Sequence, residues 1–396
     1  MEFPEKEQEV GQSSNRTGAV TFFILIVIII SVAFMVYAKN KNSDISMFDI
    51  KKLITEGLTS EDKSLKEKKI SEISFESKDI PVFTAYKNFL IKCIKGSIIC
   101  LDKEGETQWS KSVELNNPVL KTAGQYVLAA DLNGRCFYII RDKDIKWEKR
   151  IEGNIINASI NEKGYVVIVK EIKGYKGAVD VFDSEGNMVF TTGRGEKYIV
   201  SAKVTPSCDY VVLNTVDTAE ISANTEIEIL DMKSKIVGKF KKSGNIFPAV
   251  WTLRGDNVLA VSSSEVVMAG IDGKEQWKQE FKKVYSSNVV AGKYIVLAVQ
   301  EENNSGVFNG SKGVVKVMDL DGKISASYTV AGEIINVQSS EDVIAVNTGR
   351  DVVFINLKGK VLGKYLAKAS IQEISIFSGS EAAILTDKNL EVIRFN

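Results

Sequence analysis

From about residue 70 onward, the chain alternates short apolar runs with clusters of Gly, Asn, Asp and Ser. The runs are rich in β-branched and aromatic residues, as in NFLIKCI, QYVLAA, YVVIV and VIAVN. Runs of this length and composition predict β-strands, and the polar clusters between them predict turns. No comparably long helical pattern interrupts them. We therefore predict an all-β fold for residues 70–396.

One unit recurs through this region: an apolar strand, an Asp/Asn-x-x-Gly turn and a polar strand that often carries a large aromatic residue. Good copies are CLDKEGETQW, VFDSEGNMVF, AGIDGKEQW, VMDLDGKISASY and FINLKGKVLGKY, with looser copies at 139–147 and 229–240. An Asp side chain accepts hydrogen bonds from its own downstream backbone, and Gly supplies a positive φ, so the motif predicts a hairpin turn. We expect the aromatic residue of the outer strand to cover the adjacent unit. The residues assigned to this repeat are Asp102, Gly105, Trp109, Asp183, Gly186, Asp272, Gly273, Trp277, Asp319, Gly322, Asn356 and Gly359.

The spacing of these turns predicts the architecture. Their first positions are 102, 142, 183, 231, 270, 319 and 356, which leaves room for four strands in each unit. A period near 40–45 residues with four strands is typical of a β-propeller blade. After the seventh turn the chain supplies about three more strands, and Ile70–Glu76 can add the fourth. We predict a β-propeller over 70–396, closed by an N-terminal strand, with eight blades and seven as the alternative.

The repeat also resembles a known family. The segments LDKEGETQW and GIDGKEQW are similar to the repeat of the quinoprotein (PQQ-dependent dehydrogenase) propellers and of an outer-membrane-assembly lipoprotein built from the same repeat. The plan of tail, anchor and propeller resembles uncharacterised membrane proteins of Gram-positive bacteria. In quinoprotein enzymes the resemblance implies a quinone stacked on an adjacent-cysteine disulfide, beside a carboxylate-bound Ca²⁺. The motif is specific for architecture and weak for activity.

The four cysteines do not fit that quinone site. Cys93, Cys100, Cys136 and Cys208 include no adjacent pair, so we predict no cofactor and no metal site. All four lie in or beside strand-like runs, where a free cysteine behaves as a small hydrophobe. A short Lys95-Gly96 turn would pair residue 93 with residue 98, which disfavours a bridge between Cys93 and Cys100.

Residues 19–38 form an uncharged segment, AVTFFILIVIIISVAFMVYA, long enough to span about 30 Å of hydrocarbon as a helix. A cleaved signal peptide, the alternative, would have a shorter apolar region ending in small residues. We predict a single-pass transmembrane helix after a polar tail, 1–18. A linker, 39–69, follows, in which 46–58 has the spacing of a short amphipathic helix.

The flanking charges leave the side of the membrane open. Lys and Arg counts lean toward a cytoplasmic C-terminal domain, whereas long domains cross largely regardless of charge. The family resemblance favours the outside. We expect a cell-membrane protein with an extracytoplasmic propeller, and keep the cytoplasmic orientation as the alternative.

Charge and composition narrow the function classes. The chain has 51 basic and 51 acidic residues and no histidine. Zero net charge argues against a nucleic-acid binder. Without histidine, Ser-His-Asp and Cys-His catalysis and histidine metal ligands are excluded, which leaves carboxylate, Lys, Tyr or thiol chemistry.

Three predicted connections between second and third strands are long: 170–178, 214–226 and 300–313. We expect them on the face that also carries the blade-to-blade crossovers, where recognition is usual. The candidate ligand or partner residues are Asp217, Glu220, Glu301, Glu302, Asn303 and Asn304. Their oxygens suit a hard cation, but solvated loops are the favoured interpretation.

These observations predict a non-catalytic module that binds a protein or ligand at the bacterial cell envelope. The alternative is an enzyme in the propeller mouth, either a degenerate quinoprotein or a carboxylate-based hydrolase. The second form requires two or more carboxylates that converge on the centre of the ring. A sensor is disfavoured because the 18-residue tail is too short for a signalling domain.

Overall fold

The computed structural model describes residues 68–75, 81–219, 222–302, 311–330 and 333–395. The predicted tail, membrane span 19–38 and amphipathic helix 46–58 lie outside these residues. Among the residues that are described, no helix is long and apolar enough to cross a membrane. The eight sheets of the structure belong to one compact unit, Asp62–Glu301 together with Ser311–Asn396.

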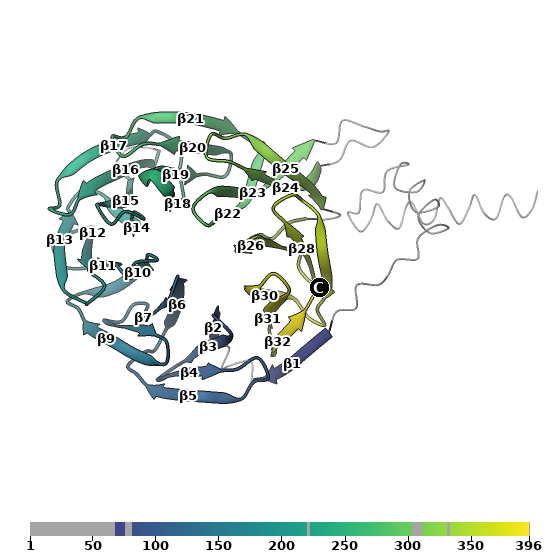
Figure 1. Ribbon diagram of the computed structural model, residues 1–396. Coiled ribbons are helices and arrows are strands. Elements are labelled where there is room, and N and C mark those ends of the chain that lie inside the picture. Colours follow the sequence, from purple (N-terminus) through teal and green to yellow (C-terminus); the bar gives the residue numbers. More distant parts are fainter. Residues whose placement is uncertain (1–67, 76–80, 220–221, 303–310, 331–332, 396) are drawn as a thin grey trace, which may run out of the picture. The chain divides into compact units, whose positions relative to one another are not determined.

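Eight antiparallel sheets of four strands each make up this unit, and we number them as blades 1 to 8 in chain order (Figure 1). Blades 1 to 4 comprise β2 (Val82–Tyr86), β3 (Phe89–Ile94), β4 (Ser97–Leu101), β5 (Thr107–Ser112); β6 (Pro118–Ala123), β7 (Tyr126–Asp131), β8 (Cys136–Arg141), β9 (Asp144–Arg150); β10 (Asn154–Ile160), β11 (Val166–Glu171), β12 (Gly177–Phe182), β13 (Met188–Arg194); and β14 (Tyr198–Val204), β15 (Tyr210–Asp217), β16 (Asn224–Asp231), β17 (Ile236–Lys242). Within each blade the chain therefore forms a simple meander.

The second half of the ring repeats this plan, with a short 3₁₀ turn, η2 (Arg254–Asp256), in blade 5. Blades 5 to 8 comprise β18 (Ala249–Thr252), β19 (Val258–Val261), β20 (Glu265–Ala269), β21 (Glu275–Glu280); β22 (Lys283–Val290), β23 (Tyr294–Glu302), β24 (Ser311–Met318), β25 (Ile324–Val330); β26 (Asn336–Ser340), β27 (Val343–Asn347), β28 (Asp351–Asn356), β29 (Val361–Leu366); and β30 (Ile371–Ser378), β31 (Glu381–Thr386), β32 (Asn389–Arg394) with β1 (Lys68–Ser74).

Blade 8 closes the ring because its outermost strand comes from the start of the described chain. Its strand order is β1-β32-β31-β30, and β1 pairs antiparallel with β32. The predictions of eight four-stranded blades and of closure by an N-terminal strand are confirmed. The strand begins at Lys68, two residues before the predicted start of the propeller. Closure pairs an edge that would otherwise be open to aggregation.

The core of the ring is divided among the seams between blades. The described residues form eight apolar clusters, and each cluster joins two neighbouring blades. The middle strands β7, β27 and β31 are buried along their whole length, whereas the outer strands β5 and β21 alternate between exposed and half-buried positions. A strand covered on both faces needs a continuous apolar run, and one with a solvent face needs alternation. This explains why the sequence contains both continuous apolar runs and alternating runs.

The recurring Asp/Asn-x-x-Gly segment forms the turn between third and fourth strands, as predicted. In blade 3, the Asp183 carboxylate accepts hydrogen bonds from the backbone N–H groups of Glu185 and Asn187, both at 2.9 Å. Gly186 closes the turn with φ 83°, a value that disfavours residues with a Cβ. In blade 4, Ser234 occupies the corresponding position with φ 65°. The looser copy in blade 2 is only a two-residue turn between Arg141 and Asp144.

The tryptophans of the outer strands cover the next blade, which confirms that expectation. The indole N–H of Trp147 donates to the Ser184 carbonyl at 2.9 Å, and that of Trp277 donates to the Leu320 carbonyl at 2.8 Å. Both acceptors lie in the hairpin turn of the following blade. Trp109 faces the shortened turn of blade 2, and its buried indole N–H has no hydrogen-bond partner among the described residues.

Candidate functional site

The innermost strands of the eight blades surround the ring axis (Figure 1). These strands are β2, β6, β10, β14, β18, β22, β26 and β30. Across all of their residues they carry three lysines, Lys121, Lys203 and Lys283, and a single carboxylate, Glu373. The axis therefore differs in charge from the chain as a whole, where acidic and basic residues are equal in number.

Lys203 is the best-defined of these lysines. Its neighbours on β14, Ala202 and Val204, are buried in the seam between blades, so strand alternation turns Lys203 toward the axis. There its ammonium group lies 4.4 Å from the ring centroid of Trp251 on β18. The Trp251 indole N–H in turn donates to the Ser287 hydroxyl on β22 at 3.2 Å. A cation–π contact and a hydrogen bond thus link blades 4, 5 and 6 at the axis.

The charge of Lys121 in blade 2 acts across the axis on Lys203 in blade 4 and on Glu373 in blade 8. Burial, together with a smaller effect from the charge of Lys121, lowers the pKa of Lys203 to about 8. Burial also raises the pKa of Glu373, which Lys121 partly offsets. No two of these three blades are neighbours in the ring, so their charges meet through its interior. We call Lys121, Lys203, Trp251 and Glu373 the axial cluster.

Neither lysine of the axial cluster is neutralised within the part of the chain that the structure describes. Lys203 contacts the face of Trp251, and no ion pair joins Lys121 or Lys203 to a described carboxylate. A solvent-accessible portion of Lys203 remains although protein atoms surround it closely. The carboxylate-based enzyme would need a second carboxylate beside Glu373, and the eight inner strands do not provide one. The arrangement is suited to holding an anion.

The three long connections join second and third strands in blades 3, 4 and 6, as predicted. They span 172–176, 218–223 and the segment between Glu302 and Ser311. Because every blade is an antiparallel meander, these connections emerge on the same face as the blade-to-blade crossovers. We call this face the loop face. Lys121 and Lys203 lie in the halves of their strands that point away from it.

The six candidate loop residues do not form one site among the described residues. Asp217 ends β15, and its carboxylate accepts the backbone N–H of Ala219 at 2.9 Å. Glu301 lies on β23 and forms an ion pair with Lys316 at 2.6 Å. Glu220, Asn303 and Asn304 lie outside the described residues, as does the side chain of Glu302, the last residue of β23. Within the described part of the chain, no group of three or more Cys, Asp or Glu side chains is arranged to hold a metal ion.

The loop face instead carries an exposed apolar patch that sequence reasoning missed. Ile156, Tyr175, Tyr198 and Val200 are 43%, 52%, 48% and 38% exposed. Ile156 and Val200 occupy equivalent bulges near the starts of the neighbouring inner strands β10 and β14. We call these four residues the loop-face patch. Tyr175, an aromatic residue inside a predicted polar loop, was the signal available in the sequence.

Packing at the end of blade 3 holds this patch in place. The ring of Tyr175 lies so close to Gly193 that a Cβ there would approach it to 2.4 Å. The ammonium group of the adjacent Lys176 lies 5.2 Å from the ring centroid of Tyr198. A Cβ on Gly177 would meet Ile199, so the loop 172–176 lies against the start of β14. Gly193 therefore permits the close approach of Tyr175, and Gly177 permits that of Ile199, the neighbour of Tyr198.

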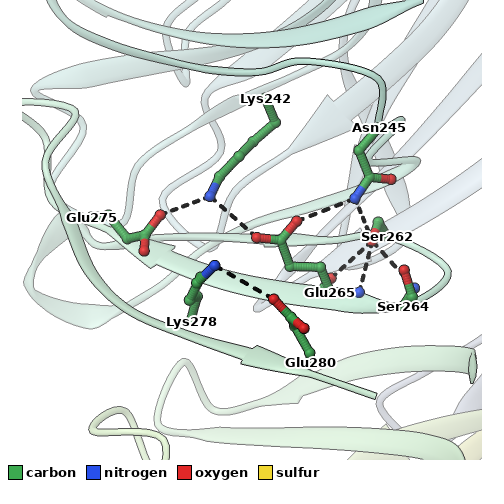
Figure 2. A network of polar contacts seen from close by, with 8 residues as sticks. All are labelled: Lys242, Asn245, Ser262, Ser264, Glu265, Glu275, Lys278 and Glu280. Atoms are coloured by element: carbon green, nitrogen blue, oxygen red, sulfur yellow. Dashed lines mark hydrogen bonds and ion pairs between the residues drawn. The ribbon is translucent and has the colours of Figure 1, made fainter. Parts of the chain in front are cut away.

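The charged residues between blades form compensated networks, and Figure 2 shows one of them. Lys242 at the end of β17 contacts Glu265 at 3.2 Å and Glu275 at 2.7 Å in blade 5, and the Asn245 amide donates to Glu265 at 3.2 Å. Burial acts to lower the pKa of Lys242, but hydrogen bonds to Glu275 and Glu265 outweigh it and raise the pKa. Arg194 similarly binds the buried Glu228 at 2.6 Å.

The four cysteines are free thiols. Cys93, Cys100 and Cys136 are buried, and Cys93 pairs with Ile98 across the β3–β4 hairpin, as the short turn predicted. Burial raises the pKa of Cys93 to about 12 and that of Cys100 to about 11. Since the thiolate is the reactive form, both groups are poor nucleophiles at neutral pH.

Residues 60–395 match the model of a family of unknown function (DUF5711). The chain belongs to this family. No curated protein matches it. The match covers the whole propeller, so the axial cluster and the loop-face patch both lie within the region that the family model describes.

Several solved structures share the fold. BamB from Moraxella catarrhalis has a TM-score of 0.51 at 13% identity, covering 83% of this chain and 100% of that one. Sqt1 from Chaetomium thermophilum has a TM-score of 0.58 at 9% identity, covering 84% and 99%. The Neurospora crassa Pan2 WD40 domain has a TM-score of 0.50 at 11% identity, covering 83% and 95%. These likenesses show a β-propeller repeat protein; a closer relation to the quinoproteins stays a prediction.

Proposed function

We propose that this protein is a non-catalytic β-propeller, anchored in the cell membrane, that binds a protein partner at the bacterial cell envelope. The observation that carries the proposal is the loop-face patch. Four large apolar side chains lie exposed together on the face that also carries the long connections. Contiguous apolar surface of this kind marks interaction sites, because its exposure to water is unfavourable.

The composition of the patch favours a protein as the partner. Tyrosine is enriched in protein interfaces because a rigid ring buries a large area while its hydroxyl keeps a hydrogen-bond partner. Tyr175 and Tyr198 stand on blades 3 and 4, and each is about half exposed. Lys176 beside them supplies charge at the edge of the patch. An apolar centre with a charged rim is the usual arrangement of such an interface.

The location at the membrane rests on the sequence. The uncharged segment 19–38 has the length of a transmembrane helix, and the family-matched propeller begins beyond it. Protease treatment of intact cells tests the side. Digestion of the C-terminal domain without lysis would place the propeller outside, and protection until lysis would place it in the cytoplasm.

Partner binding is tested by capture from crosslinked membranes. We expect the full-length protein to recover a specific partner, and the double variant Tyr175→Ser, Tyr198→Ser to recover at least about tenfold less, since interface aromatics commonly contribute 2 kcal/mol or more each. The matched control is Met188→Ser, because Met188 is 52% exposed at the start of the outer strand β13, on the opposite end of blade 3.

Thermal unfolding of each variant checks that the propeller stays folded. Equal recovery by the wild type, the double variant and the control would contradict the assignment of the partner to the loop-face patch. If crosslinked wild type recovers no partner at all, the binding function itself is wrong.

A further inference from the structure

We propose that the axial cluster is a second binding site, which holds a carboxylate between Lys121 and Lys203. The site goes beyond the proposed partner binding, because its two lysines lie on the inner strands, in the halves away from the loop face. Its two cations come from blades 2 and 4, which are separated by blade 3. A ligand held by both would therefore sit at the axis of the ring.

The geometry of Lys203 leaves its hydrogen-bond donors available. The ammonium group is positioned over the Trp251 ring at 4.4 Å, and Trp251 is itself fixed by its hydrogen bond to Ser287. A lysine ammonium has three N–H donors, and no described side chain or carbonyl accepts one of them from Lys203. A carboxylate oxygen is the strongest acceptor for such a charged donor.

The charge of the cluster specifies the ligand. When Glu373 is ionised, the two lysines and this carboxylate sum to one positive charge, which one carboxylate ligand neutralises. A phosphate dianion would leave an excess of negative charge and would require Glu373 to be protonated. A monovalent carboxylate is therefore the complementary ligand, because uncompensated charge is costly beside the closely surrounded Lys203, whereas Lys121 itself is exposed.

The lysines elsewhere in the ring show what a compensated site looks like. Lys242 contacts two carboxylates of the next blade, and Lys316 contacts Glu301. Lys283, the third lysine of the inner strands, lies 4.6 Å from the ring of Tyr285 at the start of β22. Like Lys203, Lys283 contacts an aromatic ring, but it lies at the loop-face end of its inner strand. Lys283 is therefore the matched control.

The carboxylate can belong to a free small acid or to the end of a partner chain. The probe for the shared chemistry is sodium acetate, compared with sodium chloride at equal ionic strength, on the full-length protein in a nonionic detergent. Lysines are labelled biosynthetically with ¹³C at Cε, which leaves each ammonium group unmodified, and the Lys203 resonance is identified by its loss in Lys203→Met. A ligand that binds only the charged amine raises its titration midpoint, by about one pH unit at ten times the Kd.

Three variants make the test specific. Lys121→Met should abolish the acetate shift of the Lys203 midpoint, and Lys283→Met should leave it unchanged. Glu373→Gln removes the internal carboxylate, so we expect it to tighten acetate binding about threefold or more. The same Lys203 midpoint in acetate and in chloride, or weaker binding in Glu373→Gln, would overturn the proposal.

A short peptide that ends in a free carboxylate distinguishes the two sources. A shift with acetate alone assigns the site to a free acid, and a shift with both admits the end of a partner chain. The site also separates cleanly from the proposed function. Lys203→Met should still capture the loop-face partner, and the double tyrosine variant should still respond to acetate.

Discussion

Two sets of lysines in this ring have opposite electrostatic surroundings. At the seam between blades 4 and 5, Lys242 lies between Glu265 and Glu275, and its pKa is raised because hydrogen bonds to these carboxylates outweigh burial (Figure 2). At the axis, Lys203 contacts an aromatic face, and burial together with Lys121 lowers its pKa to about 8. The same residue type is compensated in one place and, among the described residues, left without a counter-charge in the other.

The difference separates charges that stabilise the fold from charges that are available for binding. A seam must be filled permanently, because removing one partner of a buried pair leaves the other desolvated and unpaired. The axis need not be filled by the chain itself. Where a protein leaves a desolvated cation without a partner, that position is a candidate for a ligand.

The largest effect is expected at a buried seam carboxylate. Glu228 is 3% exposed and binds both Arg194 and Lys197. Glu228→Gln leaves Arg194 without its counter-charge, while Lys197 keeps Glu226 at 2.8 Å, and we expect the free energy of unfolding to fall by about 3 kcal/mol. Chemical denaturation at neutral pH measures the change. A loss below about 1 kcal/mol would mean that the seam pairs are as dispensable as surface pairs.

Substitution of the axial lysine should raise the free energy of unfolding instead of lowering it. The pKa of Lys203 falls from 10.5 to about 8 in the folded state, so below pH 8 both states are protonated and the full destabilisation is present. Lys203→Met removes it, and we expect a gain of about 1–2 kcal/mol at pH 7, less than the full shift implies because solvent reaches part of the side chain.

The pH dependence gives this prediction its sign. Between pH 8 and pH 10.5 the folded wild type has lost the proton of Lys203 while the unfolded chain keeps it, so wild-type stability rises with pH. The advantage of Lys203→Met should therefore shrink over that range, in buffers free of carboxylates. Lys121 acts on Lys203 and also on Glu373, and Lys121→Met should reduce the advantage of the substitution. A constant difference from pH 6 to pH 10 would contradict the assignment.

The hairpin turns could be predicted from the sequence and the axial cluster could not, for a physical reason. Turn chemistry is local: Asp183 bonds the backbone two and four residues on, and Gly186 supplies the positive φ, so the motif can be read and counted. The axial cluster joins Lys121, Lys203 and Glu373 across three blades. Nothing local marks a lysine as facing the axis until the strand that carries it has been placed as the innermost of its blade.

The loop-face patch could be predicted from the sequence only in part. The three long connections were located correctly, because length and polarity are visible along the chain. The exposed side chains beside them were not, since Ile156 and Val200 read as ordinary strand residues. Their exposure comes from a bulge in each strand, which turns the residue away from the seam. Bulges of this kind are not visible in an apolar run.

Tryptophan substitutions test whether hydrogen bonds across the seams stabilise the fold. Trp277 donates to Leu320 across the seam, and Trp277→Phe should cost about 1 kcal/mol for the lost hydrogen bond. Trp109 has no acceptor among the described residues, because the next turn is shorter, so Trp109→Phe should lose less and could gain. Thermal unfolding compares the two. Equal losses would mean that the indole of Trp109 is satisfied by water.

The smallest expected effect tests whether burial, rather than ion pairing by itself, determines how much a charged pair stabilises the fold. Lys278 and Glu280 form an ion pair at 3.4 Å on the outer strand β21, with side chains 51% and 74% exposed (Figure 2). Solvent screens such a pair, so Glu280→Gln should change the free energy of unfolding by less than about 0.5 kcal/mol. Denaturant midpoints with and without 0.5 M salt measure it against Glu228→Gln. If both substitutions cost the same, ion pairing alone would account for the stability of the seams. The contrast with the axis would then fail, because burial would no longer distinguish a charge that stabilises the fold from a charge that is available for binding.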